Sequence, residues 1–260
     1  GLYLPLIALQ YHEVRIDIDL APDFDTFLNK SVFKVWANYV YLDTEERRRF
    51  AQKGHEYLIE QVQHTGTDTV DPSATKQVRL SYNHPVKELV WCFSNTAAKS
   101  SLWNFTKNNL VTEVALQSNP SDQSHVDSNC YVPISNLGTP MFSTELSTAA
   151  YTEEASGQLE TFKLVLNGQD RFKEQKGKYF NQVQAYNHHS GCPAPGVYSY
   201  SFALKPEEHQ PTGTCNFSRI DNAQVAVKMA AGTATSMHMF ATNYNVLRIQ
   251  SGMGGLAFSN

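Results

Sequence analysis

Apolar and polar residues alternate with a period of two over several stretches of this 260-residue chain. In residues 197–204, larger side chains such as Tyr198 and Phe202 alternate with smaller ones. Residues 159–166 and 12–20 show the same alternation. Because neighbouring side chains of a strand point to opposite faces of a sheet, each stretch predicts a β-strand with one buried face.

Runs of β-branched and aromatic residues predict further strands. They cover residues 33–42, 77–82, 87–93, 223–229 and 239–250, with a weaker candidate at 110–116 and a segment at 57–63 that is ambiguous between strand and helix. One short helix is predicted at residues 45–52, where Asp43 and Glu46 form a capping pair and Gly54 ends the helix.

Turn residues separate these strands. Asn167 and Gly168 predict a tight hairpin, and residues 117–157 and 169–195 are polar enough to predict two long surface connections. Many short strands with turns between them, and almost no helix, predict an all-β protein, either a sandwich or a jelly roll.

The charge and the cysteines narrow the function. With 21 basic and 25 acidic residues the net charge is −4, which gives no basic excess for nucleic acid. No apolar run approaches the roughly 20 residues of a transmembrane helix. The cysteines, Cys92, Cys130, Cys192 and Cys215, lie far apart without a Cys-x-x-Cys pair. We expect free thiols in a reducing compartment and no zinc site.

Two groups of residues suggest chemistry, but only weakly. His188 and His189, with His209 and a nearby glutamate, resemble the ligands of a metal-binding cupin. Adjacent histidines in a strand point to opposite faces, and the cupin His-x-His spacing is absent, so solvated loop histidines are expected. Ser218 and Asp221 would complete a triad with His209, yet no nucleophile-elbow motif is present. We therefore expect no catalytic residue, metal or cofactor.

Surface candidates remain. The residues considered for subunit contact are Arg47, Arg48, Arg49, Trp103 and Phe105. The arginines form either a solvated helix face or a contact, and the aromatic residues either anchor a neighbour or lie under their own loop. The Asn-x-Ser/Thr triplets begin at Asn29, Asn104 and Asn216. They are glycan acceptors only in a chain that enters the secretory pathway, and we expect them to be unmodified.

Four long sequence segments, here called phrases, carry a family resemblance. They are LPLIALQYHEVRIDIDL at residues 4–20, YVYLDTEERRRFAQKGHEYLIEQVQ at 39–63, SFALKPEEHQPTGTCNFSRIDN at 201–222 and NYNVLRIQSGMGGLAFSN at 243–260. In their amino-acid sequence and in their order along the chain, they resemble the major capsid proteins of nucleocytoplasmic large DNA viruses.

The resemblance implies the C-terminal portion of a protein with two tandem jelly rolls. Residues 1–32 would end the first jelly roll and provide the linker, and residues 33–260 would form the second. Such proteins form trimers, the pseudo-hexagonal capsomers that tile an icosahedral shell around an internal membrane. The implied partners are copies of itself and minor capsid proteins, without direct nucleic-acid contact. The implied location is the virion, after assembly in the host cytoplasm, and no enzyme activity is implied.

Two other classes stay open at this point. A carbohydrate-binding jelly-roll module would need exposed aromatic residues in a groove. A metal-dependent, cupin-like enzyme would need a bound metal. Neither class accounts for the four phrases.

Overall fold

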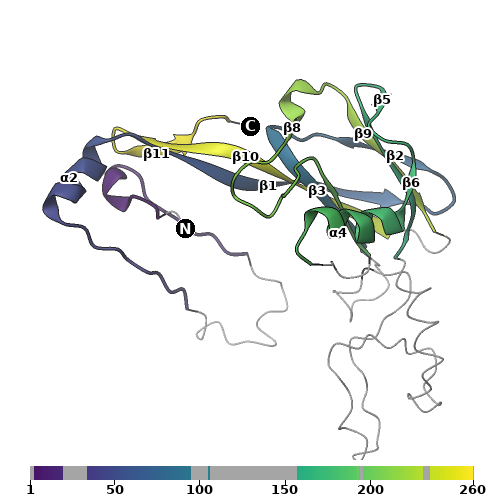
Figure 1. The fold of residues 1–260 in the computed structure, drawn as a ribbon, viewed down its shortest axis with the longest axis horizontal. Coiled ribbons are helices and arrows are strands. Elements are labelled where there is room, and N and C mark those ends of the chain that lie inside the picture. Colours follow the sequence, from purple (N-terminus) through teal and green to yellow (C-terminus); the bar gives the residue numbers. More distant parts are fainter. Residues whose placement is uncertain are drawn as a thin grey trace, which may run out of the picture. The chain divides into compact units, whose positions relative to one another are not determined.

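The protein is described here from a computed structural model, which defines residues 3–19, 34–94, 105, 157–191, 193, 196–230 and 235–259 (Figure 1). The chain forms two compact units, Gly1–Ile59 with Asn245–Asn260 and Glu60–Tyr244. The predicted strand at 110–116 and the connection at 117–157 lie outside the described residues.

Two antiparallel sheets make up most of the structure. The first has the order β1 (His55–Val70), β10 (Thr235–Gln250), β3 (Pro85–Ser94) and β7 (Val197–Ser201). The short β11 (Met253–Leu256) pairs with β10, and β8 (Cys215–Asn216) pairs with β3. The second sheet has the order β2 (Lys76–Leu80), β9 (Ala223–Met229), β4 (Leu159–Leu166) and β5 (Gln169–Asp170), with β6 (Gln175–Lys176) beside β4.

The strand order identifies the fold as a jelly roll. Numbered one to eight along the chain, with the short β6, β8 and β11 left aside, the strands run 1-8-3-6 in one sheet and 2-7-4-5 in the other. The first strand thus pairs with the eighth, the second with the seventh, the third with the sixth and the fourth with the fifth. This is the pairing of one long hairpin rolled into two sheets, so the predicted all-β jelly-roll sandwich is confirmed.

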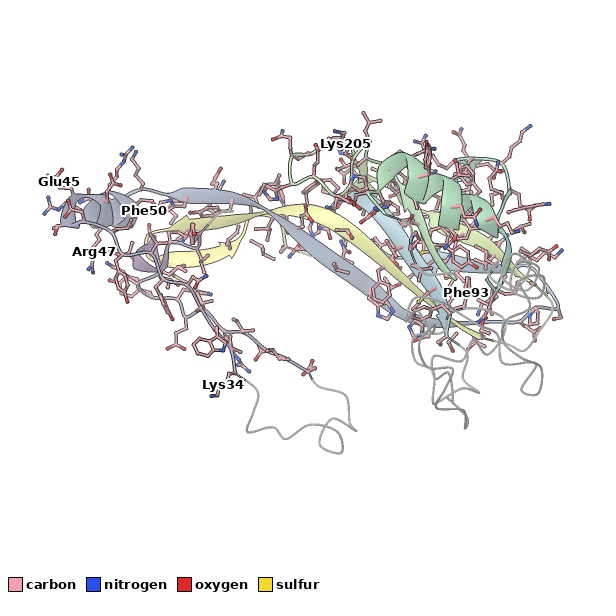
Figure 2. All side chains as sticks on the ribbon, turned by 60° about the horizontal axis from the view of Figure 1, so that its bottom comes forward. Lys34, Glu45, Arg47, Phe50, Phe93 and Lys205 are labelled. Atoms are coloured by element: carbon pink, nitrogen blue, oxygen red, sulfur yellow. The ribbon has the colours of Figure 1, made fainter. Side chains whose placement is uncertain are left out.

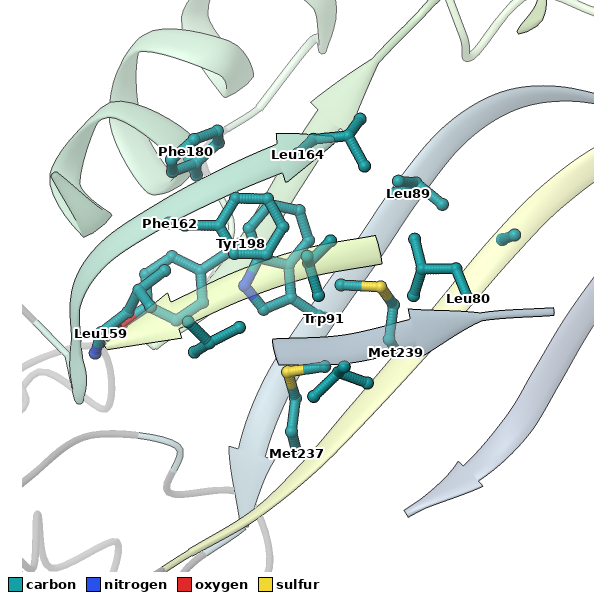
Figure 3. Packing of buried hydrophobic residues seen from close by; sticks show 14 of the residues in the cluster. Leu80, Leu89, Trp91, Leu159, Phe162, Leu164, Phe180, Tyr198, Met237 and Met239 are labelled. Atoms are coloured by element: carbon teal, nitrogen blue, oxygen red, sulfur yellow. Dashed lines mark hydrogen bonds between the residues drawn. The ribbon is translucent and has the colours of Figure 1, made fainter. Parts of the chain in front are cut away.

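Alternation along the strands builds the core. In β9 every second residue is buried, and in β3 Leu89, Trp91 and Phe93 are fully buried. Trp91 and Phe162 of β4 stack with 4.2 Å between ring centroids, which joins the two sheets (Figure 3). Tyr198, Phe180, Met237 and Met239 complete the packing around them. In the predicted strand 159–166 the side with Phe162 and Leu164 is buried as expected, whereas the predicted strand 197–204 ends at Ser201, and Leu204, on its apolar side, is exposed.

Helical turns cover the outer edge of β7. They are η5 (Tyr179–Val183) and α4 (Gln184–His188), which lie in the predicted polar connection 169–195. The Asn181 side chain donates to the carbonyl of Val197 at 2.7 Å, and the amide of Ser201 donates to Gln184 Oε1 at 3.2 Å. The predicted polar connection therefore contains short helical segments that the sequence did not predict, and contacts with β7 stabilise them.

The single predicted helix is confirmed as α2 (Thr44–Gln52). The side chain of Asp43 accepts from the amide of Thr44 at 2.6 Å and so caps the helix without forming the predicted pair with Glu46. The ambiguous segment 57–63 is part of β1. Elsewhere in this part of the chain, η1 (Leu6–Ala8) is a single turn.

Two predicted strands are absent where the structure describes them. Residues 12–19 and 34–42 have no regular structure, and many of their apolar side chains are exposed. A strand persists only when neighbouring strands satisfy its backbone groups, and an alternating sequence supplies no such neighbour. Among the described residues, no helix is both long and apolar enough to cross a bilayer.

Candidate functional site

The phrase that carries most of the resemblance folds into a turn, here called the signature turn (residues 201–222), which is fastened to Lys87. In the pairing of β3 with β10, Thr242 faces Glu88 and Asn243 faces Val86, so Lys87 is an extra, bulged residue. Its carbonyl accepts the amides of Phe202 at 2.9 Å and Ala203 at 3.2 Å. The bulge therefore gives the start of the turn its backbone partners.

Lys87 is buried, with only 3% of its surface exposed. Its Nζ donates to the carbonyl of Pro206 at 2.7 Å and lies 2.7 Å from Glu60 Oε2. The ring of Tyr244 lies 5.6 Å from the same Nζ. A buried ammonium group is stable only when it is paired and hydrogen-bonded, and here both conditions are met.

Polar side chains of the signature turn bind its own backbone. Thr212 Oγ1 accepts from the amide of Lys205 at 2.9 Å and donates to its carbonyl at 3.2 Å. Asn216 Oδ1 accepts from the amide of Ser218 at 3.1 Å, where the 3-10 turn η6 (Phe217–Arg219) begins. Ser218 Oγ accepts from the amide of His84 at 2.8 Å. These hydrogen bonds from polar side chains therefore fix the backbone conformation of the signature turn.

The end of the turn is joined to the predicted hairpin. The amide of Asn222 donates to Asn167 Oδ1 at 3.1 Å, and the amide of Asn167 donates to the carbonyl of Asn222 at 2.7 Å. Asn167 and Gly168 both have positive φ, 50° and 79°, as a type I′ turn requires. The predicted hairpin between β4 and β5 is confirmed.

Charged groups gather beside the turn. His189 follows α4, with Nε2 3.3 Å from Glu88 Oε2 and Nδ1 3.3 Å from Glu207 Oε1. Burial raises the pKa of the Glu88 carboxyl, an effect that His189 and Lys87 oppose. Hydrogen bonds from Ser190 hold the pKa of Glu207 below its ordinary value, with a smaller contribution from His189.

These contacts change the interpretation of the histidines. His189 lies between carboxylates with only 19% of its side chain exposed, so the expectation of a solvated loop histidine was wrong for this residue. His188 Nδ1 lies 3.0 Å from the carbonyl of Leu204, and His209 lies 3.9 Å from Glu60. The described residues contain no group of three or more side chains arranged to hold a metal. The grouping of Glu88 with His189 has no sequence signal, because the two residues are far apart in the chain.

An exposed arm, residues 34–53, contains the predicted arginine contact. Trp36 is 88% exposed, and α2 contains no buried residue. Phe50 stacks on His55 at 5.4 Å, and His55 Nε2 lies 2.7 Å from the carbonyl of Phe50, which attaches the helix end to β1 (Figure 2). No ion pair joins Arg47, Arg48 or Arg49 to another described residue. Whether they form a solvated face or a subunit contact stays a prediction.

The other surface candidates are only partly described. Phe105 is half-buried, and its carbonyl lies so close to Gly196 that a Cβ there would overlap it. Asn216 is exposed, and its side chain caps η6. Trp103, Asn29 and Asn104 lie outside the described residues. Subunit contact and glycosylation therefore stay predictions for all of them.

Among the described cysteines, Cys92 and Cys215 are free thiols, as expected. Burial raises the pKa of both thiols, which disfavours the reactive thiolate.

The outer face of the β2–β9–β4–β5 sheet has a shallow depression of about 240 Å³. Its lining consists of Gln77, Lys163, Val165, Gly168, Asp170, Gln224 and Ala226. Stacking on sugar rings needs aromatic side chains, and this lining contains none. The depression gives no support to the carbohydrate-binding alternative.

Residues 46–255 match the family model of the large eukaryotic DNA virus major capsid protein. The chain belongs to this family. Over its whole length it is 42% identical to the major capsid protein of Paramecium bursaria Chlorella virus 1 and 39% identical to that of Phaeocystis pouchetii virus. The chain spans 64% and 63% of the lengths of these two major capsid proteins.

Solved structures agree with the family. A crystal structure of PBCV-1 VP54, fitted into a reconstruction of the virophage Sputnik, matches 85% of this chain with a TM-score of 0.63 and 39% identity. The quasi-atomic model of the PBCV-1 virus capsid matches with a TM-score of 0.62 and 38% identity. The matches cover 56% of each of those chains. The similarity to major capsid proteins therefore holds for the three-dimensional fold as well as for the sequence.

Proposed function

We propose that this chain is part of a major capsid protein that forms trimers, the pseudo-hexagonal capsomers of an icosahedral shell around a large DNA virus. The observation that carries the proposal is the jelly-roll strand order in a chain that is 42% identical to a viral major capsid protein. The match to a chain of the PBCV-1 virus capsid supports it. The role is mechanical: the sandwich is a rigid block whose outer surfaces meet other subunits.

The division of the chain is also a proposal. Residues 1–32 end a first jelly roll and provide the linker, and residues 33–260 form the second. Residues 12–19 support this division, because Val14, Ile16 and Ile18 are exposed on an unpaired segment of alternating sequence. Such a segment is stabilised when a neighbouring sheet covers its apolar side.

Subunit contacts are proposed at Arg47, Arg48 and Arg49 on α2, and at Trp103 and Phe105. A three-fold arrangement joins different patches of neighbouring subunits, and arginine forms two parallel hydrogen bonds with a carboxylate. The exposed arm supports the first site, because its arginines make no ion pair within the described part of the chain.

The remaining partners follow from the same role. We propose minor capsid proteins as further neighbours, an internal membrane nearby, no direct contact with nucleic acid and no catalysis. Assembly takes place in the host cytoplasm, and the mature protein lies in the virion shell. The free, half-buried thiols of Cys92 and Cys215 are consistent with a reducing site of assembly.

Electron cryomicroscopy of native particles tests the proposal. We expect the sandwich of residues 60–244 to fit the outer shell in three-fold capsomers, with density continuing from the N-terminal segment into a second sandwich. Particles whose shell has no place for this sandwich would refute the capsid role. Glycan-array binding at micromolar strength by a chain that is absent from the shell would favour the carbohydrate-binding module.

The 260-residue chain gives a second test of its division into two jelly rolls. We expect a monomer in size-exclusion chromatography with light scattering, because no strand among the described residues covers the apolar side of residues 12–19. A stable trimer of this chain alone would contradict that division and leave the capsid role unaffected.

A further inference from the structure

Two buried polar atoms face each other beside the signature turn. Nε2 of His189 lies 3.3 Å from Oε2 of Glu88, and the two side chains are 19% and 14% exposed. Neither atom makes a hydrogen bond with any residue that the structure describes. A buried carboxylate oxygen and an imidazole lone pair repel each other, so this contact is favourable only with a proton between the two atoms.

The opposite side of the same imidazole faces the signature turn. Nδ1 of His189 lies 3.3 Å from Glu207 Oε1, and both oxygens of Glu207 accept from the amide of Ser190 at 3.1 Å. The ring therefore connects three segments, which are β3 through Glu88, the end of α4 through His189 itself, and the turn through Glu207.

Other charged groups surround this arrangement. Lys87 lies next to Glu88 on β3 and pairs with Glu60 of β1, while His209 of the turn lies 3.9 Å from Glu60. Tyr244 of β10 faces Lys87, and His188 of α4 contacts the carbonyl of Leu204. The nearby pair of Lys205 and Glu208 is exposed and binds within the turn. Lys87 pairs with Glu60 and also opposes the raised pKa of Glu88, while His189 is the group that contacts both Glu88 and Glu207 directly.

We propose that a proton shared between His189 and Glu88 strengthens the attachment of the end of α4 and of the signature turn to β3, and that loss of this proton with rising pH weakens the attachment of both segments. The fastening exists within a single chain, so it does not rest on the capsid role.

The protonation states fix the direction of the effect. With the proton on His189, an imidazolium donates towards Glu88 and towards Glu207. With the proton on Glu88, its hydroxyl donates to Nε2 while Nδ1–H still faces Glu207. Without it, the neutral imidazole has a single N–H, which donates either to Glu88 or to Glu207, and its lone pair faces the other carboxylate. Burial raises the pKa of Glu88, so its contribution is present at low pH and is lost as the pH rises through its titration.

Hydrogen exchange of the full 260-residue chain, followed by mass spectrometry from pH 5.5 to 8.5, tests the proposal. Rates are corrected for the intrinsic pH dependence of exchange, and peptides from β9 serve as an internal reference. We expect protection of residues 184–191 and 202–212 to fall by about tenfold more than that of β9 as the pH rises.

Two variants remove the shared proton without removing the contact. In Glu88→Gln the amide donates permanently to a neutral imidazole, and in His189→Gln no titrating ring remains. Both variants are expected to keep protection of the two segments constant across the range. The matched control is Glu160→Gln, whose partner is Lys228 on the exposed face of the other sheet, and it is expected to behave like the parent chain.

Two results would overturn the proposal. One is a parent chain in which the two segments follow the pH dependence of β9. The other is a Glu88→Gln chain that retains the full pH dependence of the parent. The parent series needs no variant, so the test stands even if a substitution prevents folding.

Discussion

Trp91 of β3 lies almost flat against Phe162 of β4, with 4.2 Å between ring centroids and 16° between ring planes. The two residues belong to different sheets, so this stack joins the halves of the sandwich. Phe180 packs against both rings, at 5.3 and 5.1 Å. Three aromatic residues therefore meet in one place, where a single truncation removes contacts to both sheets.

Trp91→Ala is expected to lower the free energy of unfolding by about 3–5 kcal/mol, because it leaves a large cavity between the sheets. Urea unfolding followed by circular dichroism measures the change. Trp36→Ala is the matched control, since Trp36 is 88% exposed and its loss should change stability by less than about 0.5 kcal/mol. Equal effects of the two substitutions would show that the stack does not hold the sheets together.

Lys87→Met is expected to destabilise the chain by about 3–5 kcal/mol. The substitution leaves Glu60 without its cation and the carbonyl of Pro206 without its donor. Lys228→Met removes a solvent-exposed pair with Glu160 and should cost less than about 1 kcal/mol. Urea unfolding at neutral pH measures both changes in stability. A Lys87→Met chain as stable as the control would mean that the bulge alone positions the turn.

Alkaline pH is expected to unfold the sandwich through two buried phenols. Burial raises the pKa of Tyr82 and of Tyr198 to about 12. A pKa above that of the unfolded chain means that the contribution is complete below about pH 10 and is lost between about pH 10 and 12. The loss is on the order of 2–3 kcal/mol per phenol.

The double variant Tyr82→Phe, Tyr198→Phe should be less stable at pH 7 by about 1–3 kcal/mol for each lost hydroxyl. The hydroxyl of Tyr82 donates to the carbonyl of Met239, and that of Tyr198 accepts from the amide of Leu159. Its stability should then decline less steeply between pH 10 and 12 than that of the parent. Tyr186→Phe, at an exposed position, should keep the parent slope; an unchanged slope in the double variant would contradict the prediction.

Charge reversal of Arg47, Arg48 and Arg49 to Glu is expected to reduce capsomer assembly at least about tenfold without changing the unfolding of the single chain by more than about 0.5 kcal/mol. Light scattering of the assembled capsid protein measures the first quantity and urea unfolding the second. Conversion of the exposed residues Lys173, Lys176 and Lys178 to Glu is the matched control for net charge. Undisturbed assembly would assign the arginines to a solvated face.

Elements with both a pattern and neighbouring strands to pair with were predictable from sequence. The prediction for β4 has the observed bounds, Leu159–Leu166, because alternation, the Asn167-Gly168 turn and the following strand are all local. The bounds of β9 were also predicted, since its buried face is regular. Residues 34–42 have a similar composition but pair with no strand among the described residues. Composition alone therefore did not predict whether this segment forms a strand.

The candidate site was less predictable. The family resemblance of residues 201–222 is visible in the sequence, but the conformation of this segment depends on Lys87. The bulged position of Lys87 follows from a register shift between β3 and β10. Likewise, η5 and α4 form in a polar segment because Asn181 and Gln184 find backbone partners on β7. Long-range pairing of this kind leaves no periodic trace in the sequence.

The side chains of Asn181 and Gln184 occupy two hydrogen-bonding groups on the outer edge of β7, which affects how copies of this chain can meet. An open strand edge is a template on which another chain can add a strand, and repeated addition leads to fibrils. With these two groups occupied, addition of a strand to β7 is disfavoured. The contacts that hold η5 and α4 in place therefore also protect the chain against fibril growth from this strand.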